Sequence, residues 1–127
     1  MNKTIAAFVV ALTLIAGGPA QAQSMDINTI LNGIGSSSFL TAASKVHSAS
    51  SVRVVRMSTL AAAERSAARI KSVVARKARD IDYLRSGLVL NPSAITAIKY
   101  SGVSLDQIVS LHMSGDGAAV LYADDVQ

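Results

Sequence analysis

The sequence contains neither cysteine nor tryptophan, and it has only two prolines. The lack of thiols excludes disulfides, thiolate metal sites and cysteine nucleophiles. Aromatic residues make up only 4% of the chain, so a hydrophobic core has to be built mainly from aliphatic side chains. We therefore expect a domain that is stabilised by packing alone, without a covalent cross-link.

The patterns that accompany metal sites and the common enzyme chemistries are also missing. His47 and His112 are the only histidines and lie far apart in the sequence, whereas a metal site needs three or four converging ligands. Ser110, His112 and Asp116 are close in sequence, but a catalytic triad confined to one hairpin would have no cleft and no oxyanion hole. The sequence thus predicts a protein that is not an enzyme and that binds neither a metal nor another cofactor.

Residues 1–22 have the features of a cleavable secretory signal peptide. The positive charge of Lys3 precedes an apolar run over residues 5–16, and this run is shorter than the roughly 20 residues that a membrane-spanning helix needs. The small residues Ala20 and Ala22 suit a signal peptidase, so cleavage is expected after Ala22. We expect export by a bacterial Sec pathway and a periplasmic or secreted mature protein that does not span the membrane. The alternative is an uncleaved membrane anchor.

Residues 23–50 are rich in serine, alanine, asparagine and glycine. Their apolar pattern, centred on residues 27–34, is weak and permits a short helix at most. We expect this part of the mature chain to be a flexible N-terminal segment. A small α+β domain is expected to follow over residues 51–127.

Two elements are predicted in the first half of that domain. The β-branched residues 51–57 predict a strand. Apolar side chains then recur every three or four positions over residues 60–86, which predicts one long amphipathic helix. Ser58 or Thr59 would cap its start, and Gly87 would take the left-handed position that ends it. Such a helix would be about 40 Å long, so we expect a kink or an overhang.

The second half of the domain is predicted to be a short helix followed by a hairpin. Asn91 and Pro92 favour a helix start, and residues 108–113 and 118–123 alternate in polarity on either side of a glycine-containing turn. The element order predicts an α+β fold in which a three-stranded antiparallel sheet (β-α-α-β-β) is covered by the one long amphipathic helix. The alternative is a loosely packed helical protein with only the C-terminal hairpin.

Charge is distributed unevenly along the chain, which has a formal net charge of +4. Residues 45–85 are strongly basic and residues 86–127 are acidic. On the predicted long helix, four arginines gather opposite the apolar stripe and form a candidate anion-binding face. Its members are Arg65, Arg69, Arg76 and Arg79. Nucleic acid is disfavoured as the ligand because no aromatic side chains interleave with these arginines, and the alternative is a solvated surface.

Two hypotheses for the function follow from these features. The first is a small exported, non-enzymatic interaction protein that contacts another protein of the bacterial envelope through a sheet edge or the basic helix. The second is a binder of anionic envelope surfaces, lipopolysaccharide or anionic lipid, through the four arginines. The apolar stripe also forms a partial heptad pattern that permits a homodimer, although packing on the protein's own sheet accounts for the same stripe.

Overall fold

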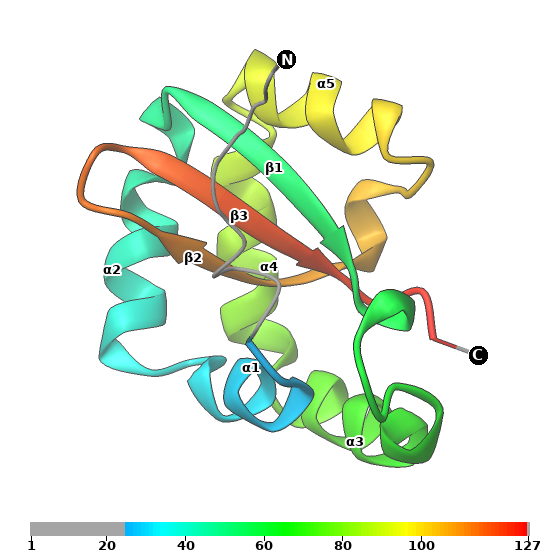
Figure 1. The fold of residues 1–127 in the computed structure, drawn as a ribbon. Coiled ribbons are helices and arrows are strands. Elements are labelled where there is room, and N and C mark those ends of the chain that lie inside the picture. The colour runs from blue at the N-terminus through cyan, green and yellow to red at the C-terminus, as the bar shows by residue number, and fades with distance from the viewer. Residues whose placement is uncertain (1–24, 127) are drawn as a thin grey trace.

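The computed structural model describes residues 25–126. Within this range three strands form one sheet in the order β1–β3–β2, and five α-helices pack around it (Figure 1). The strands are β1 (Ser51–Arg56), β2 (Ile108–Met113) and β3 (Ala118–Ala123). The last strand of the chain therefore lies in the centre of the sheet, and β1 and β2 form its two edges. The predicted α+β class and the three strands are confirmed.

The sheet is mixed, and the prediction of a purely antiparallel sheet is wrong. β2 and β3 form the expected antiparallel hairpin, but β1 runs parallel to β3, with Ser51 opposite Ala118 and Arg56 opposite Ala123. A parallel pair needs a long crossover connection, and here the chain between the two strands contains three α-helices and β2. The polarity pattern of a strand does not encode the direction in which it pairs, so the sequence could not distinguish the two arrangements.

The turn between β2 and β3 sets the register of the hairpin. Ser114 donates a backbone hydrogen bond of 2.9 Å to the carbonyl oxygen of Ala118, and Gly117 donates one of 3.1 Å to the carbonyl oxygen of Ser114. Gly117 has a φ of 89°, a left-handed conformation that glycine adopts without strain. Ser114 and Ala118 are thus the closing hydrogen-bonded pair of the hairpin.

The helices are distributed unequally around the sheet (Figure 1). Helices α2 (Ser37–Lys45) and α4 (Ala78–Leu88) pack against each other and against β2, whereas α5 (Pro92–Tyr100) packs against β1. Helices α1 (Ile27–Gly33) and α3 (Ala67–Arg76) lie at one end of the sheet, below its strands in Figure 1. Both α1 and α2 contact β2, so this edge strand has helices beside it but no second strand partner within the described residues.

The hydrophobic core lies between the sheet and these helices. Leu121 in the central strand is fully buried, as are Leu84 and Leu88 of α4. The N-terminal helices and the turn between them add further large apolar side chains to the same cluster, namely Ile27, Ile30, Leu31, Ile34 and Phe39. Removing α1 and α2 would expose a substantial part of this core.

Residues 23–50 were expected to form a flexible segment outside the domain, but in the described part of this range α1 and α2 are helical and pack into the core. Their polar residues begin helices: the Asp26 carboxylate accepts a hydrogen bond from the Thr29 amide at 2.8 Å, and the Ser36 hydroxyl accepts one from the Phe39 amide at 3.1 Å. Side chains of this type are preferred helix N-caps. Helices α1 and α2 are therefore part of the folded domain.

The long helix predicted over residues 60–86 is divided into several pieces. Residues 60–63 are irregular, a 3₁₀ turn spans Glu64–Ser66, and α3 and α4 meet at Lys77. Lys77 has φ −106° and ψ 20°, which lies outside the helical region. Because of this break, α3 and α4 can each turn an apolar face towards a core that is shorter than one straight helix.

Gly87 has a different role from the one expected. It lies inside α4 instead of ending the helix in a left-handed conformation. A Cβ atom at this position would lie 2.9 Å from the Val46 Cγ1 atom and 3.2 Å from the Ala43 carbonyl oxygen. Gly87 therefore allows α4 to approach the end of α2 closely.

The predicted signal peptide, residues 1–22, lies outside the described residues. Over residues 25–126, none of the helices has both the length and the apolar character that crossing a membrane would require.

Candidate functional site

The four arginines of the candidate anion-binding face do not lie on one continuous helix. Arg65 belongs to the 3₁₀ turn, Arg69 and Arg76 to α3, and Arg79 to α4 beyond the break. All four are exposed, but Arg69 donates hydrogen bonds to the side-chain oxygens of two asparagines in α1. This arginine holds two helices together, and the regular spacing that suggested a single face does not extend across Lys77.

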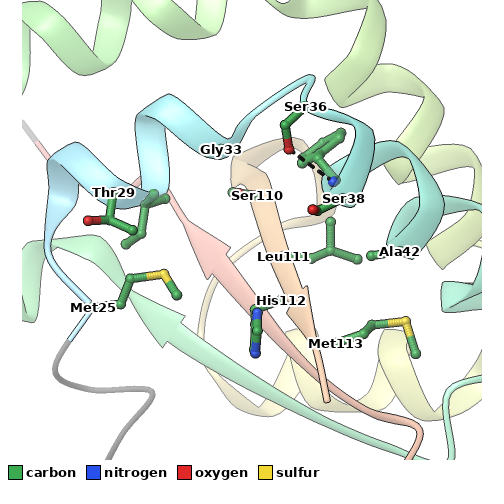
Figure 2. A pocket seen from close by; sticks show the side chains of 12 residues that line it. Met25, Thr29, Gly33, Ser36, Ser38, Ala42, Ser110, Leu111, His112 and Met113 are labelled. Atoms are coloured by element: carbon green, nitrogen blue, oxygen red, sulfur yellow. Dashed lines mark hydrogen bonds between the residues drawn. The ribbon is translucent and has the colours of Figure 1, made fainter. Parts of the chain in front are cut away.

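A groove of about 460 Å³ lies along the outer edge of β2 (Figure 2). Four consecutive residues of the strand line it, from Ser110 to Met113. Successive side chains of a strand point to opposite faces of the sheet, so a hollow that touches all four residues lies along the edge of the strand. We call it the edge groove. Its opposite walls come from the N-terminal helices and their flanks, chiefly Met25, Thr29, Ile30, Ser38, Phe39 and Ala42.

The outer edge of β2 presents unpaired backbone groups to this groove. In an antiparallel ladder, hydrogen-bonded and non-hydrogen-bonded pairs alternate. Because Ser114 is bonded to β3, His112 and Ser110 also bond to β3, whereas Leu111 and Met113 turn their N–H and C=O groups away from it. Within the described part of the chain, no hydrogen bond uses these outward groups. An edge of this kind is a template for pairing with another strand.

A second hollow adjoins the edge groove at Met113, the last residue of β2. This hollow has a volume of about 370 Å³ and shares Ser38, Ala42 and Met113 with the edge groove. Among residues 25–126, no aspartate, glutamate, lysine or arginine lines either hollow. The described walls therefore offer apolar surface, hydroxyl groups, backbone and the imidazole of His112.

Two of the three residues that a Ser-His-Asp triad would need, Ser110 and His112, lie in β2 beside the groove. Ser110 and His112 are two residues apart in β2 and so share a face of the sheet, and Ser110 lies opposite Tyr122. Asp116 stays in the hairpin turn, where its carboxylate accepts hydrogen bonds from the Ser114 hydroxyl and the Ala118 amide. The carboxylate is held by the turn, so the geometry assembles no catalytic triad.

Tyr122 is the one buried side chain of the described residues whose polar atom has no hydrogen-bond partner. Burial raises the pKa of Tyr122, and the positive charge of Arg53 acts in the opposite direction. The phenol therefore stays protonated at neutral pH. Among residues 25–126, no three side chains of the types that bind metals come together.

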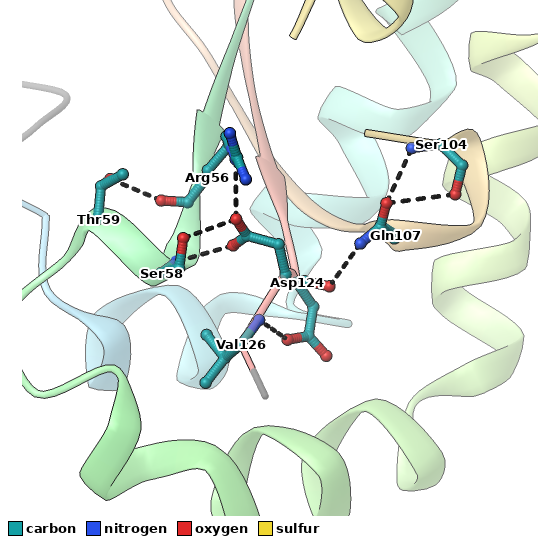
Figure 3. A network of polar contacts seen from close by, with 8 residues as sticks. Arg56, Ser58, Thr59, Ser104, Gln107, Asp124 and Val126 are labelled. Atoms are coloured by element: carbon teal, nitrogen blue, oxygen red, sulfur yellow. Dashed lines mark hydrogen bonds and ion pairs between the residues drawn. The ribbon is translucent and has the colours of Figure 1, made fainter. Parts of the chain in front are cut away.

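A polar network at the C-terminal end of β3 fastens the tail of the chain (Figure 3). The Asp125 carboxylate accepts hydrogen bonds from the Arg56 guanidinium at 2.8 Å and from the Ser58 amide and hydroxyl at 2.8 and 2.6 Å. Burial alone would raise the pKa of Asp125, but these hydrogen bonds and the charge of Arg56 lower it below its ordinary value. Burial raises the pKa of the neighbouring Asp124, whose carboxylate accepts a hydrogen bond from Val126. Asp125 in the acidic tail therefore has a structural role, because its carboxylate attaches the C-terminal residues to the rest of the domain.

No family model, curated protein or solved structure matches this chain. Over residues 25–126 the fold is that of a small α+β domain with a mixed three-stranded sheet and five α-helices. The edge groove is the feature of this fold from which a function can be argued.

The residues that wall the edge groove could not be recognised as site residues from the sequence pattern. Met25, Thr29 and Ser38 lie in the part of the chain that was expected to be flexible. The available signals were the N-cap residues Asp26 and Ser36 ahead of apolar side chains, which together indicate helix starts. Even with both helices predicted, their position beside β2 depends on tertiary packing.

Proposed function

We propose that this protein is a small exported, non-enzymatic interaction protein that holds a partner polypeptide in the edge groove. One observation supports this proposal above the others: Leu111 and Met113, whose outward backbone groups have no partner among the described residues, line a groove walled by α1 and α2. The proposed export rests on the signal-peptide features of residues 1–22, and it places the partner in the periplasm or outside the cell.

The chemistry of the groove favours binding over catalysis. His112 is the only titratable side chain that lines it, and general acid–base or nucleophilic chemistry needs at least two converging groups with matched roles. Apolar walls with a few polar groups are instead typical of recognition sites.

Site-specific photo-cross-linking in living cells tests the proposal. A benzoylphenylalanine at Ser38, which lines both hollows, should form an adduct with a partner polypeptide. The matched control places the same group at Thr96, an exposed residue beside the opposite sheet edge. Position 38 should give an adduct that position 96 does not give, and Ala42→Arg, which narrows the groove, should abolish it.

Two results would contradict the proposal. The first is an adduct pattern that is the same at both positions or that persists in the Ala42→Arg variant. The second is co-sedimentation of the protein with anionic liposomes at low salt that is lost when Arg65, Arg76 and Arg79 are changed to glutamine. That second result would favour the binding of anionic envelope surfaces instead.

A further inference from the structure

We infer that the edge groove takes an extended, uncharged polypeptide segment, which pairs with β2 as a fourth strand of the sheet. This inference rests on the proposed function and specifies the chemistry of the partner. Recognition would come mainly from the ligand's own backbone, with a limited selection of its side chains.

The spacing of the unpaired groups supports an extended ligand. Leu111 and Met113 are two residues apart in β2, so their outward groups repeat at about 7 Å along the edge. An added strand presents its own N–H and C=O groups at the same interval, and it would satisfy both sets of backbone groups at once. The adjoining hollow between Met113 and α2 adds further space for the ligand at the end of β2.

The lack of charge in the groove selects against charged segments. A carboxylate or ammonium group placed between α1, α2 and β2 would lose water without gaining a partner of opposite charge. Serine and threonine hydroxyls, such as that of Ser38, can form hydrogen bonds with the ligand's backbone groups that face away from β2. The complementary segment is therefore one of small or β-branched, uncharged residues.

A second copy of this chain is a poorer fit than a single extended segment. Two copies related by a twofold axis would have to bring their β2 edges together. Each edge lies in a groove that is also lined by Met25, Thr29, Phe39 and Ala42, so the helical walls of the two copies would meet before the strands could pair.

Amide hydrogen exchange on the purified protein tests the pairing directly. The probe is a capped hexapeptide of alternating threonine and valine, and the control is the same peptide with all of its backbone amides N-methylated. The unmethylated peptide should slow exchange of the Leu111 and Met113 amides at least about tenfold, in proportion to its occupancy. The Ser110 and His112 amides, which are already bonded to β3, should change little, and the methylated peptide should have no effect.

A matched pair of variants separates the backbone contact from the side-chain contact. Met113→Pro removes an N–H group that points away from β3, so the hairpin ladder keeps its hydrogen bonds. Met113→Ala keeps the N–H group and shortens the side chain. Peptide affinity should fall about tenfold in the proline variant, the equivalent of one lost hydrogen bond, and by much less in the alanine variant. Unchanged thermal unfolding of the hairpin would show that the proline variant is folded.

Four outcomes would overturn the inference. Three of them are protection of β1 amides in place of β2 amides, equal binding of a peptide in which glutamate replaces valine, and concentration-dependent protection of Leu111 and Met113 without peptide. The last of these three would indicate a second copy. Fourth, if the position-38 adduct forms in cells but no peptide protects these amides, the inference fails while the proposed function stands. Peptide pairing without any position-38 adduct would contradict the proposed function alone.

Discussion

The side-chain amide of Asn91 donates a 2.9 Å hydrogen bond to the backbone carbonyl oxygen of Val46. The same amide also donates to Ala49, and the Asn91 side-chain oxygen accepts from the backbone amides of Ser93 and Ala94. Asn91 is only 3% exposed. One buried side chain therefore begins α5 and satisfies the carbonyl groups that follow α2.

Replacing this side chain should be costly. Asn91→Ala removes a helix cap and leaves buried carbonyl oxygens without a donor, so we expect a loss of about 2–4 kcal/mol in the free energy of unfolding. Asn91→Asp keeps the cap acceptor but removes the donor, and it should also destabilise the protein. Urea denaturation measures both effects. Ser36→Ala, which removes only the cap of α2, should cost about 1 kcal/mol, and equal losses in all three variants would contradict this account.

Gly87→Ala should destabilise the protein although alanine is the better helix former by about 1 kcal/mol. The new Cβ atom would lie 2.9 Å from Val46 Cγ1, and relieving such a contact costs about 1–3 kcal/mol. Gly33→Ala is the matched control, because nothing lies within 4 Å of a Cβ atom there. Thermal unfolding should separate the two variants, and a Gly87→Ala protein more stable than wild type would refute the close approach of α2 and α4.

The hydrogen bonds and ion pair of the Asp125 carboxylate should make the free energy of unfolding depend on pH. Because the folded-state pKa of Asp125 lies below the unfolded value of 3.8, its contribution is fully present above pH 3.8 and is lost as the pH falls through the folded pKa. Asp125→Asn removes this contribution. The difference in unfolding free energy between wild type and variant should be constant near neutral pH and should shrink on acidification. If the difference in unfolding free energy instead grew as the pH falls, the pKa of Asp125 could not be lowered in the folded state.

The four arginines of the candidate anion-binding face should divide into two groups by their effect on the stability of the protein. Arg69→Gln removes hydrogen bonds to Asn28 and Asn32, and because these contacts are exposed the loss should be about 0.5–1 kcal/mol. Hydrogen exchange in α1 should quicken in the same variant. Glutamine at Arg65, Arg76 and Arg79 together should leave both measurements unchanged, and a larger effect from these three than from Arg69 would contradict the assignment.

Elements of the fold could be predicted where the residues of one short segment are enough to determine its structure. The hairpin around Gly117 has alternating strands and a turn residue, and the strand over residues 51–56 is rich in β-branched side chains. The helix after Asn91 has a cap and a proline at its first position. Each of these elements depends on residues close together in the chain.

The features that could not be predicted depend on distant contacts. The direction of β1 is decided by its pairing with β3, and the break at Lys77 by the size of the core. The edge groove requires three elements to meet, of which two were hidden by the serine and asparagine content of residues 23–50. The four arginines looked equivalent because periodicity cannot reveal that Arg69 bonds to α1.

The central position of β3 has a consequence for how this chain folds. β3 ends at Ala123, and it pairs with a strand that begins at Ser51. Closing so long a stretch of chain is slow, because its loop entropy must be lost before any contact is gained. During synthesis the helices can form early, but neither edge strand has its partner until β3 has been synthesised. The sheet is therefore the last layer of this domain that can assemble, after the helices that cover it.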